Sequence, residues 1–320
     1  MIIKCKNFFK VILFFVILCL IFGCISLFLK PKANTRSAGF YHPSAYSICN
    51  EPNNTIDLLI LGTSEAYCSF IPLELWEDTG IPAYLCSTPN QPLYYAEAFL
   101  HKTFETQTPS IVVIETDTIF QEFDEIDILD YKIDETFIVK KYHGRWKKMK
   151  KRDFFFHNDY SQRHYDKGFM YDFDQQVVPQ INHMIPTEEV EPIPEINLYY
   201  LDRIVKYCEE KGVKIVFVSA ISTAYWNYSK HNAIIALADQ YDIEYIDANF
   251  YVSELNLDWD ADWQDNGKHL NYYGALKFTK WFEQYLLKYG ELNDKRGNPD
   301  YAFWDLDIKQ AEFDIPQLSN

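Results

Sequence analysis

Short apolar runs alternate along the chain with longer stretches whose apolar residues recur at helical spacing. The short runs are rich in β-branched side chains, as in strands that are buried on both faces of a sheet. They lie at residues 56–61, 111–114, 213–218 and 243–246, with a weaker strand expected at 83–86.

Helical patterns lie between these expected strands. They cover residues 92–104, 195–211 and 229–240, and Gly212 is placed to end the second of them. Strands that alternate with helices predict an α/β fold of three layers, α/β/α, around a mostly parallel, flavodoxin-like sheet.

One long region breaks the alternation. Residues from about 120 to 194 are rich in Tyr, Phe, His and charged side chains and contain no clear buried strand. We interpret this region as an insertion or lid within a single domain that spans residues 37–320.

The N-terminus is apolar enough to suggest a membrane anchor. Val11–Leu29 is a run of 19 uncharged residues, about the length that crosses a ~30 Å hydrocarbon core. A cleaved signal peptide is one alternative, because three lysines precede the run, and a lipoprotein signal ending at Cys24 is another. We favour the anchor, because the apolar run continues beyond Cys24 and because Phe22 fits a lipoprotein signal poorly.

The orientation of this anchor is less clear from charge. Three basic residues precede the run and three follow it by residue 36, so the positive charges are nearly balanced. Since a lone N-terminal apolar segment usually acts as an export signal, we expect residues 1–36 to be a single-pass anchor and linker. The bulk of the chain is then extracytoplasmic, at the cell membrane.

The chain as a whole is acidic, with a formal net charge of −16. Residues 1–36 hold six basic side chains and no acid, so the rest is more acidic still. This argues against nucleic acid as a partner, because phosphate binding needs clustered Lys and Arg. The exception is residues 140–152, which hold eight basic side chains and are open to two interpretations: a patch that meets an anionic glycopolymer or lipid headgroups, or a solvated helix face.

No metal or other cofactor is expected. His143, His157 and His164 have spacings that fit no compact metal motif, and the acids at 258–265 lack the glycine turn of a calcium loop. The cysteines outside the anchor have no metal-ligand spacing, and we expect them to be buried thiols.

A candidate nucleophile follows the first expected strand. Ser64 comes after Leu61-Gly62-Thr63, and ligands bind at the carboxyl ends of strands in parallel sheets. A glycine there permits a tight turn, and the backbone N–H groups of a following helix can stabilise an oxyanion. Alone, this signal is weak, because the same residues often form a turn or a helix cap.

A candidate base lies some 200 residues later. His269 is in a loop after the last expected strand, and Asp265 and Asp262 precede it. A serine nucleophile needs a histidine base, and that base needs a carboxylate to orient it. Asn271 is a candidate N-cap for a final helix that Gly290 is expected to close.

Together these residues resemble a known superfamily. Strand-Gly-Thr-Ser64 near the start and Asp265-x-x-x-His269-Leu-Asn-x-x-Gly-Ala near the end resemble the SGNH (GDSL-like) hydrolases. The likeness is greatest to the membrane-anchored bacterial branch that includes relatives of alginate O-acetyltransferases and of the D-alanyl transfer protein of teichoic-acid alanylation. The likeness covers residues 56–118 and 195–289. Within the first of these ranges, residues 83–95 are similar to the second of the sequence blocks that members of this superfamily share.

The resemblance implies roles for individual residues. Ser64 would be the nucleophile, His269 the base and Asp265 the orienting carboxylate, although one more residue separates Asp265 from His269 than is usual, and Asp262 remains a rival. The oxyanion hole would use backbone N–H groups of Ser64 and Asn90, the latter in place of the usual glycine. The usual asparagine of the third block is replaced by Glu115-Thr116-Asp117, so the Gln91 side chain is the candidate substitute.

We therefore expect a serine esterase or O-acyltransferase that acts on an acyl ester of an extracytoplasmic glycan or glycopolymer, with a membrane acyl-donor protein as a possible partner. The alternative is a catalytically inactive, membrane-anchored scaffold of a polymer-modifying complex, which the departures in the second and third blocks favour. A third hypothesis is an esterase that acts on lipids.

Overall fold

The computed structural model describes residues 2–154 and 157–318, which form two compact units. The first unit is Met1–Pro43 with Asp124–Gln162, and the second is Ser44–Phe123 with Arg163–Asn320. This grouping differs from the expected boundary at residue 36 and from an insertion over 120–194. Only the first half of that region packs with the N-terminal segment, whereas 163–194 packs on the sheet of the second unit.

The second unit is built on a parallel sheet. Its strands are β1 (Leu58–Gly62), β2 (Ala83–Ser87), β3 (Ile111–Glu115), β4 (Lys214–Ser219) and β5 (Glu244–Asp247). They lie in the order β2-β1-β3-β4-β5, and every pairing is parallel. This is the flavodoxin-like order of doubly wound folds, so the predicted α/β architecture is confirmed, with all five expected strands present.

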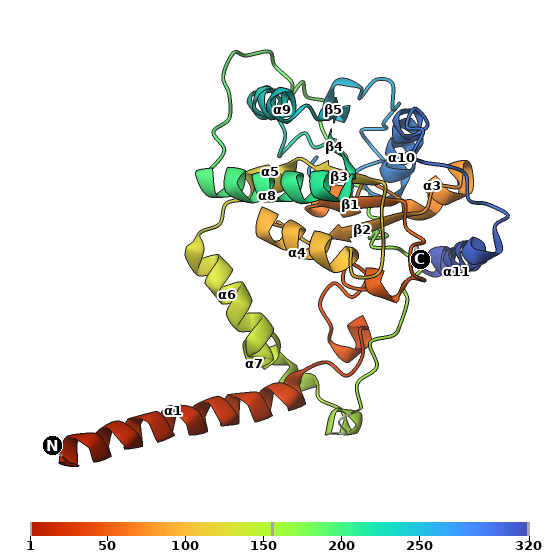
Figure 1. The fold of residues 1–320 in the computed structure, drawn as a ribbon. Coiled ribbons are helices and arrows are strands. Elements are labelled where there is room, and N and C mark those ends of the chain that lie inside the picture. Colours follow the sequence, from red (N-terminus) through yellow and green to blue (C-terminus); the bar gives the residue numbers. More distant parts are fainter. Residues whose placement is uncertain (1, 155–156, 319–320) are drawn as a thin grey trace. The chain divides into compact units, whose positions relative to one another are not determined.

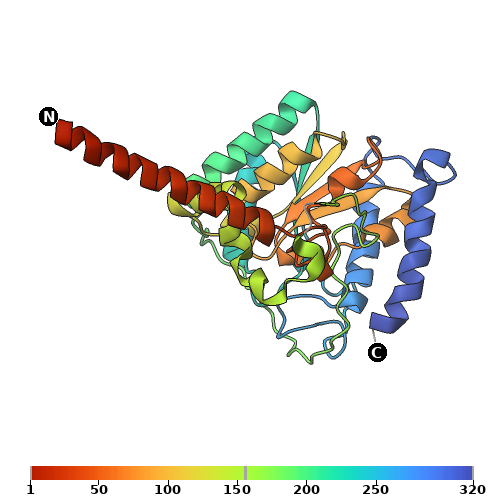
Figure 2. The same ribbon diagram turned by 90° about the horizontal axis from the view of Figure 1, so that it is seen from below.

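Helices cover both faces of the sheet (Figure 1). One face carries α3 (Pro72–Thr79) and α10 (Tyr272–Leu286), and the other carries α4 (Leu93–Thr103), α8 (Glu195–Lys211) and α9 (Tyr228–Tyr241). Figure 2 shows α4 and α8 side by side on their face of the sheet. The three predicted layers are therefore present.

Shorter helices and one C-terminal helix complete this unit. They are α2 (Ser64–Tyr67), α5 (Asp117–Phe120), α11 (Ala302–Leu318) and the 3₁₀ turns η2 (Ile48–Asn50), η5 (Ala248–Phe250) and η6 (Pro299–Tyr301). The prediction that Gly290 closes the last expected helix is wrong, because α10 ends at Leu286 and Leu287, in a right-handed conformation, is its C-cap.

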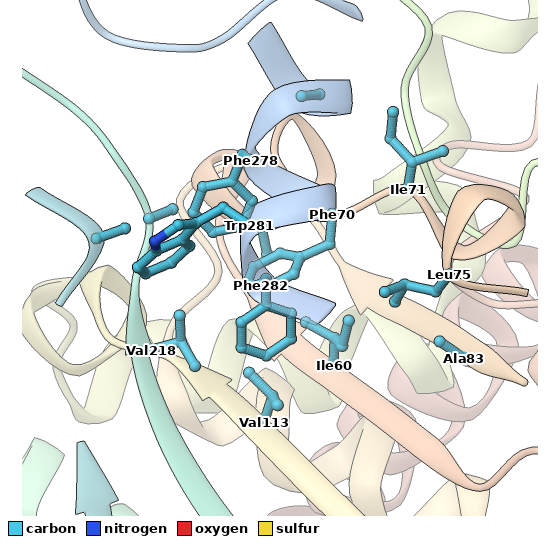
Figure 3. Close-up of a cluster of buried hydrophobic side chains, with 14 of the residues drawn as sticks. Ile60, Phe70, Ile71, Leu75, Ala83, Val113, Val218, Phe278, Trp281 and Phe282 are labelled. Atoms are coloured by element: carbon cyan, nitrogen blue, oxygen red, sulfur yellow. The ribbon is translucent and has the colours of Figure 1, made fainter. Parts of the chain in front are cut away.

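The main core lies between α10 and the sheet (Figure 3). Phe278 and Phe282 of α10 meet Phe70 edge to face, at ring-centroid distances of 4.9 and 5.1 Å. Beneath them lie side chains of successive strands, including Ile60 and Val113. These contacts hold the start of α10, and with it the loop that carries His269, at the carboxyl edge of the sheet.

The first unit contains the apolar helix α1 (Ile2–Leu29). Its segment Phe8–Leu29 is 22 residues long and includes an 18-residue stretch with a mean hydropathy of 3.1, and its side chains are mostly exposed. This helix is long and apolar enough to cross a membrane. A signal sequence near the N-terminus would meet the same criteria of length and composition.

Further helices of the first unit are joined by ion pairs. They are η1 (Arg36–Ala38), α6 (Glu125–Thr136), α7 (Ile138–Tyr142), η3 (His143–Lys148) and η4 (Lys151–Phe154). Arg145 is buried, pairs with Asp153 and donates to the carbonyl oxygens of Leu29 and Ala38 at 3.0 and 2.7 Å. Lys140 pairs with Asp130. Two of the basic residues in the segment 140–152, Lys140 and Arg145, are thus paired with acids of the same unit.

Candidate active site

Ser64 lies at the carboxyl edge of the sheet, two residues after β1 and at the first position of α2. Thr63 is the N-cap of this short helix, and its hydroxyl accepts a hydrogen bond from Glu65 N. The Ser64 N–H is at a position where a helix supplies no partner for it. The Ser64 residue is half-buried at this edge.

Gly62 makes this turn possible. A Cβ atom at residue 62 would lie 2.5 Å from Glu115 Cβ and 2.8 Å from Ala66 Cβ, closer than real Cβ atoms approach one another. The end of β1 can therefore come this close to β3 and α2 only with glycine at this position.

The structure brings Ser64, His269 and Asp265 into one hydrogen-bonded chain. Ser64 Oγ lies 2.8 Å from His269 Nε2, and His269 Nδ1 lies 2.7 Å from Asp265 Oδ2. The second oxygen of Asp265 accepts from the backbone N of His269 at 2.8 Å. Asp262, the rival carboxylate, is buried and pairs instead with Lys277 at 2.6 Å.

The loop that carries His269 is braced from two sides. Trp263 and Leu270 form an antiparallel bridge at its base, and Asn271 caps α10 by accepting from Tyr273 N and Gly274 N, as predicted. At its tip, Gly267 has φ +78°, and a Cβ atom there would lie 2.1 Å from Thr223 Oγ1.

The loop after β4 supplies the second support, which the sequence did not indicate. Ser222 Oγ donates to Lys268 O at 2.8 Å, and Thr223 N donates to Gly267 O at 2.8 Å. The rings of Tyr225 and His269 also meet in a T-shaped arrangement, with centroids 6.0 Å apart. The loop that carries His269 is thus held by residues 222–225, which follow β4, while Asp265 holds the imidazole itself.

The loop after β2 contains the other predicted oxyanion donors. Asn90 is exposed and has φ +48°, a conformation that asparagine tolerates better than most residues. The Gln91 side chain is fully buried, donates to Cys86 O at 3.1 Å and accepts from Thr88 Oγ1 at 3.0 Å. Its amide therefore braces its own loop, and the oxyanion roles of Asn90 and Gln91 stay predictions.

Three carboxyl groups cluster beneath Ser64, and sequence reasoning did not identify this cluster. Glu65, Glu115 and Asp117 are all buried. Thr63 donates to Glu115 Oε2 through its backbone N (3.2 Å) and its hydroxyl (3.1 Å), and Lys230 Nζ lies 3.1 Å from Asp117 Oδ1. Glu115, which occupies the third-block position where an amide was expected, thus holds the turn before the nucleophile.

The cluster makes ionisation unfavourable. Burial, followed by repulsion from Asp117, raises the pKa of Glu115 to about 8, although hydrogen bonds from Asp117 N and Thr63 oppose the shift. Burial, then Asp117 and Glu115, raise the pKa of Glu65 well above its ordinary value. Glu65 Oε1 lies 3.8 Å from His269 Nε2, the same imidazole nitrogen that lies near Ser64 Oγ.

Within residues 2–154 and 157–318, no group of three His, Cys, Asp or Glu side chains is arranged to hold a metal ion. The thiols of Cys68, Cys86 and Cys208 are buried and free, as predicted, and Cys49 is half-buried.

The fold and the site define a class: a doubly wound α/β protein with a Ser-His-Asp chain at the carboxyl edge of its sheet. No protein-family model matches the chain, and no curated protein matches it. Several solved structures are similar to it, and two of them are described here. One is a candidate acylhydrolase from Bacteroides fragilis, with 11% identity, a TM-score of 0.38, and coverage of 76% of this chain and 94% of the other.

The second is a candidate GDSL-like lipase from Parabacteroides merdae, with 13% identity and a TM-score of 0.36. The match covers 73% of this chain and 96% of the lipase. At these identities and TM-scores the likeness carries no weight for activity, which must be inferred from the geometry of the site.

Proposed function

We propose that this protein is an SGNH-type serine esterase or O-acyltransferase that acts on an acyl ester of an extracytoplasmic glycan or glycopolymer. The observation that supports this most is the continuous hydrogen-bonded chain from Ser64 Oγ through His269 to Asp265, at 2.8 and 2.7 Å. A nucleophile within reach of a base, with that base oriented by a third group, is the general signature of nucleophilic acyl chemistry.

In the proposed reaction, His269 Nε2 takes the proton of Ser64 as Oγ attacks the ester carbonyl. Asp265 stabilises the resulting imidazolium through Nδ1. The tetrahedral intermediate then collapses, His269 gives its proton to the departing alcohol oxygen, and the acyl group remains on Ser64. Water or a sugar hydroxyl resolves this ester by the same steps in reverse, which gives hydrolysis or transfer.

The negative oxygen of the intermediate needs donors that are already in place. The Ser64 N–H has no partner within α2, and the Asn90 backbone N–H is the proposed second donor. With Gln91 engaged in its own loop, the oxyanion hole would lack one side-chain donor, which costs roughly 10²–10³ in turnover in other acyl-transfer enzymes.

We place this chemistry at the outer surface of a membrane. Phe8–Leu29 supplies the proposed anchor, and a membrane acyl-donor protein is the proposed partner for transfer. An esterase that acts on lipids is distinguished by its substrates, because it would cleave acylated lipids and leave acylated sugars intact.

A second candidate function is an inactive scaffold of a polymer-modifying complex. It is favoured by the engaged amide of Gln91 and by Glu115, which has a carboxyl group where the resemblance leads one to expect an amide donor. The two candidates differ in one property, the reactivity of Ser64.

Labelling with a fluorophosphonate tests this property. The full-length chain in detergent should gain the mass of a single adduct, and the Ser64→Ala variant should gain none while keeping its melting temperature. Ser161→Ala is the matched control, because Ser161 is exposed and its hydroxyl bonds to a carboxylate, Asp159, without an imidazole. A folded parent protein that takes up no label would support the scaffold instead.

A further inference from the structure

Two adjoining hollows lie on the second unit, beside the loop that follows β5. Their volumes are about 720 and 680 Å³, each within the range of ligand sites. They share Gln180, Asn256, Leu257 and Trp259, so they form one continuous trough. The trough is walled by residues 177–184 and 249–260, and it is separate from the residues of the proposed chemistry.

The trough is lined by apolar side chains and by polar ones, and most of the polar ones are uncharged. Its polar neutral members are Gln180, Asn182, His183, Asn249, Ser253 and Asn256. The half-buried Trp259 ring stacks on the fully buried Trp263, with centroids 5.5 Å apart and an angle of 23° between the rings. The trough therefore offers a fixed aromatic surface among side chains that both donate and accept hydrogen bonds.

The wall of the trough is continuous with the loop that carries His269. Val178 N donates to Trp259 O at 2.8 Å, and Val178 Cγ1 would lie 3.1 Å from a Cβ atom at Gly267. On the other side, Asn249 Oδ1 accepts from Ser222 N at 3.1 Å. Ser222 is the residue whose hydroxyl holds Lys268 O, so both walls reach the loop beside the imidazole.

We propose that this trough binds a neutral saccharide chain. Amide side chains match the donors and acceptors of sugar hydroxyls, and the apolar C–H face of a sugar ring packs on an aromatic ring. This inference rests on the proposed function and specifies its substrate: a glycan without charge, held next to the site of acyl transfer.

The charges around the trough exclude an anionic polymer. Asp258 and Asp260 lie at one end, and the one basic side chain lining it, Lys277, is paired with Asp262 at 2.6 Å. The chain as a whole carries −16. A polyanion would therefore meet repulsion both along the trough and from the whole molecule.

Binding is tested on the full-length Ser64→Ala protein in detergent by isothermal titration with three tetrasaccharides. Cellotetraose and the N-acetylglucosamine tetramer are neutral probes, and tetragalacturonate is the anionic one. Gln180→Ala and Asn256→Gly each remove an amide from the trough, and glycine keeps the φ of +51° at residue 256. Gln240→Ala is the matched control, since Gln240 is exposed on α9.

We expect at least one neutral tetrasaccharide to bind and each trough variant to weaken it about fivefold, as the loss of an ordinary hydrogen bond would. Gln240→Ala should bind like its parent, and tetragalacturonate should not bind. The inference is overturned by a folded protein that binds neither neutral probe, by binding that ignores both trough variants, or by a preference for tetragalacturonate.

Failure of this inference can be told apart from failure of the proposed chemistry. The titration uses a protein without the Ser64 hydroxyl, so it reports saccharide binding alone. Fluorophosphonate labelling of the parent protein reports the nucleophile alone. An inactive scaffold that still holds a glycan would give the first signal without the second.

Discussion

Glu65 is a carboxyl group in an environment that opposes its charge. It is almost completely buried, with Glu115, Asp117, Asp265 and the thiol of Cys68 around it, and the Ser222 hydroxyl is the neighbour that favours ionisation. Because burial raises its pKa in the folded state, the unfolded chain ionises first as the pH rises. Glu65 therefore contributes stability that is present below its ordinary pKa of 4.5 and is lost as the pH rises through its folded-state pKa.

This predicts a pH-dependent effect of Glu65→Gln. The amide cannot ionise, so the melting temperature of the variant, relative to the parent, should increase steadily from pH 5 to pH 9 in thermal unfolding scans. Glu210→Gln, an exposed change on α8, should show a constant difference. A difference for Glu65→Gln that does not change with pH would mean that Glu65 is already ionised in the folded protein.

Asp265 allows a sharper test of the site than Ser64 alone. If Asp265 holds the tautomer of His269, Asp265→Asn should lower kcat on an aryl acetate by about 10³–10⁴-fold and leave the fold intact. Asp262→Asn is the comparison, because it removes the buried partner of Lys277 and should lower the melting temperature while sparing most of the activity. The opposite pattern would assign the orienting role to Asp262.

The central residues of the candidate site could be predicted from the sequence, but their surroundings could not. Ser64 and His269 each follow a strand, and strand ends meet at one edge, so their proximity follows from the fold class. The order of residues cannot reveal that Glu65 turns inward beside His269, because burial of a charged residue depends on what packs over it. The engagement of Gln91 by Cys86 and Thr88 likewise depends on how one loop closes.

At the scale of elements, α11 shows how a distant segment stabilises the sheet unit. Its Trp304 is fully buried and stacks on Trp76 of α3, with centroids 5.2 Å apart. Its Asp307 pairs with Lys167 at 2.6 Å, and Lys167, which is itself fully buried, also pairs with Glu51.

Removing Asp307 should therefore be costly. Asp307→Ala leaves Lys167 buried with one carboxylate instead of two, and we expect a loss of about 3 kcal/mol in the free energy of unfolding, measured by urea denaturation. Glu312→Ala, an exposed change on the same helix, should alter it by less than about 0.5 kcal/mol. If Asp307→Ala and Glu312→Ala changed the free energy of unfolding equally, the ion pair between Asp307 and Lys167 would add no net stability.

The strands could be predicted because both of their faces are buried, which leaves nearly unbroken apolar runs in the sequence. The helices α3 and α11 were not predicted. For α3 the local signals exist, since Pro72 stands at its first turn and Gly80 ends it in a left-handed conformation. For α11 they are weak, because what fixes that helix is packing of Trp304 against a helix more than 200 residues earlier.

At the scale of the whole molecule, the proposed anchor predicts how the protein partitions in the cell. The full-length chain should stay in the membrane pellet through alkaline carbonate extraction and be released by detergent. Val16→Asp combined with Ile21→Asp should release it, because each aspartate costs roughly 2.5–3.5 kcal/mol at the centre of a membrane helix. A parent protein that is extracted by carbonate, or that has lost its N-terminal residues by mass, would indicate a processed signal instead.

The division into two units could not be predicted from the sequence, because 124–162 is rich in charge and carries no strand signal that would assign it to either unit. Its grouping with the N-terminal segment depends on tertiary contacts, such as those of Arg145 with Leu29 and Ala38.

This division means that the chain passes between the units three times, at 43–44, 123–124 and 162–163. If α1 anchors the protein as proposed, a protease that cut only the first of these connections would not release the sheet unit from the membrane. The stump that holds α1 would still be clasped by Arg145 and its neighbours, which remain covalently joined to the sheet unit by the other two connections. Release of the sheet unit would require cuts at all three connections or the unfolding of the smaller unit, so the proposed anchoring would survive a single cut that frees a protein held by one connection.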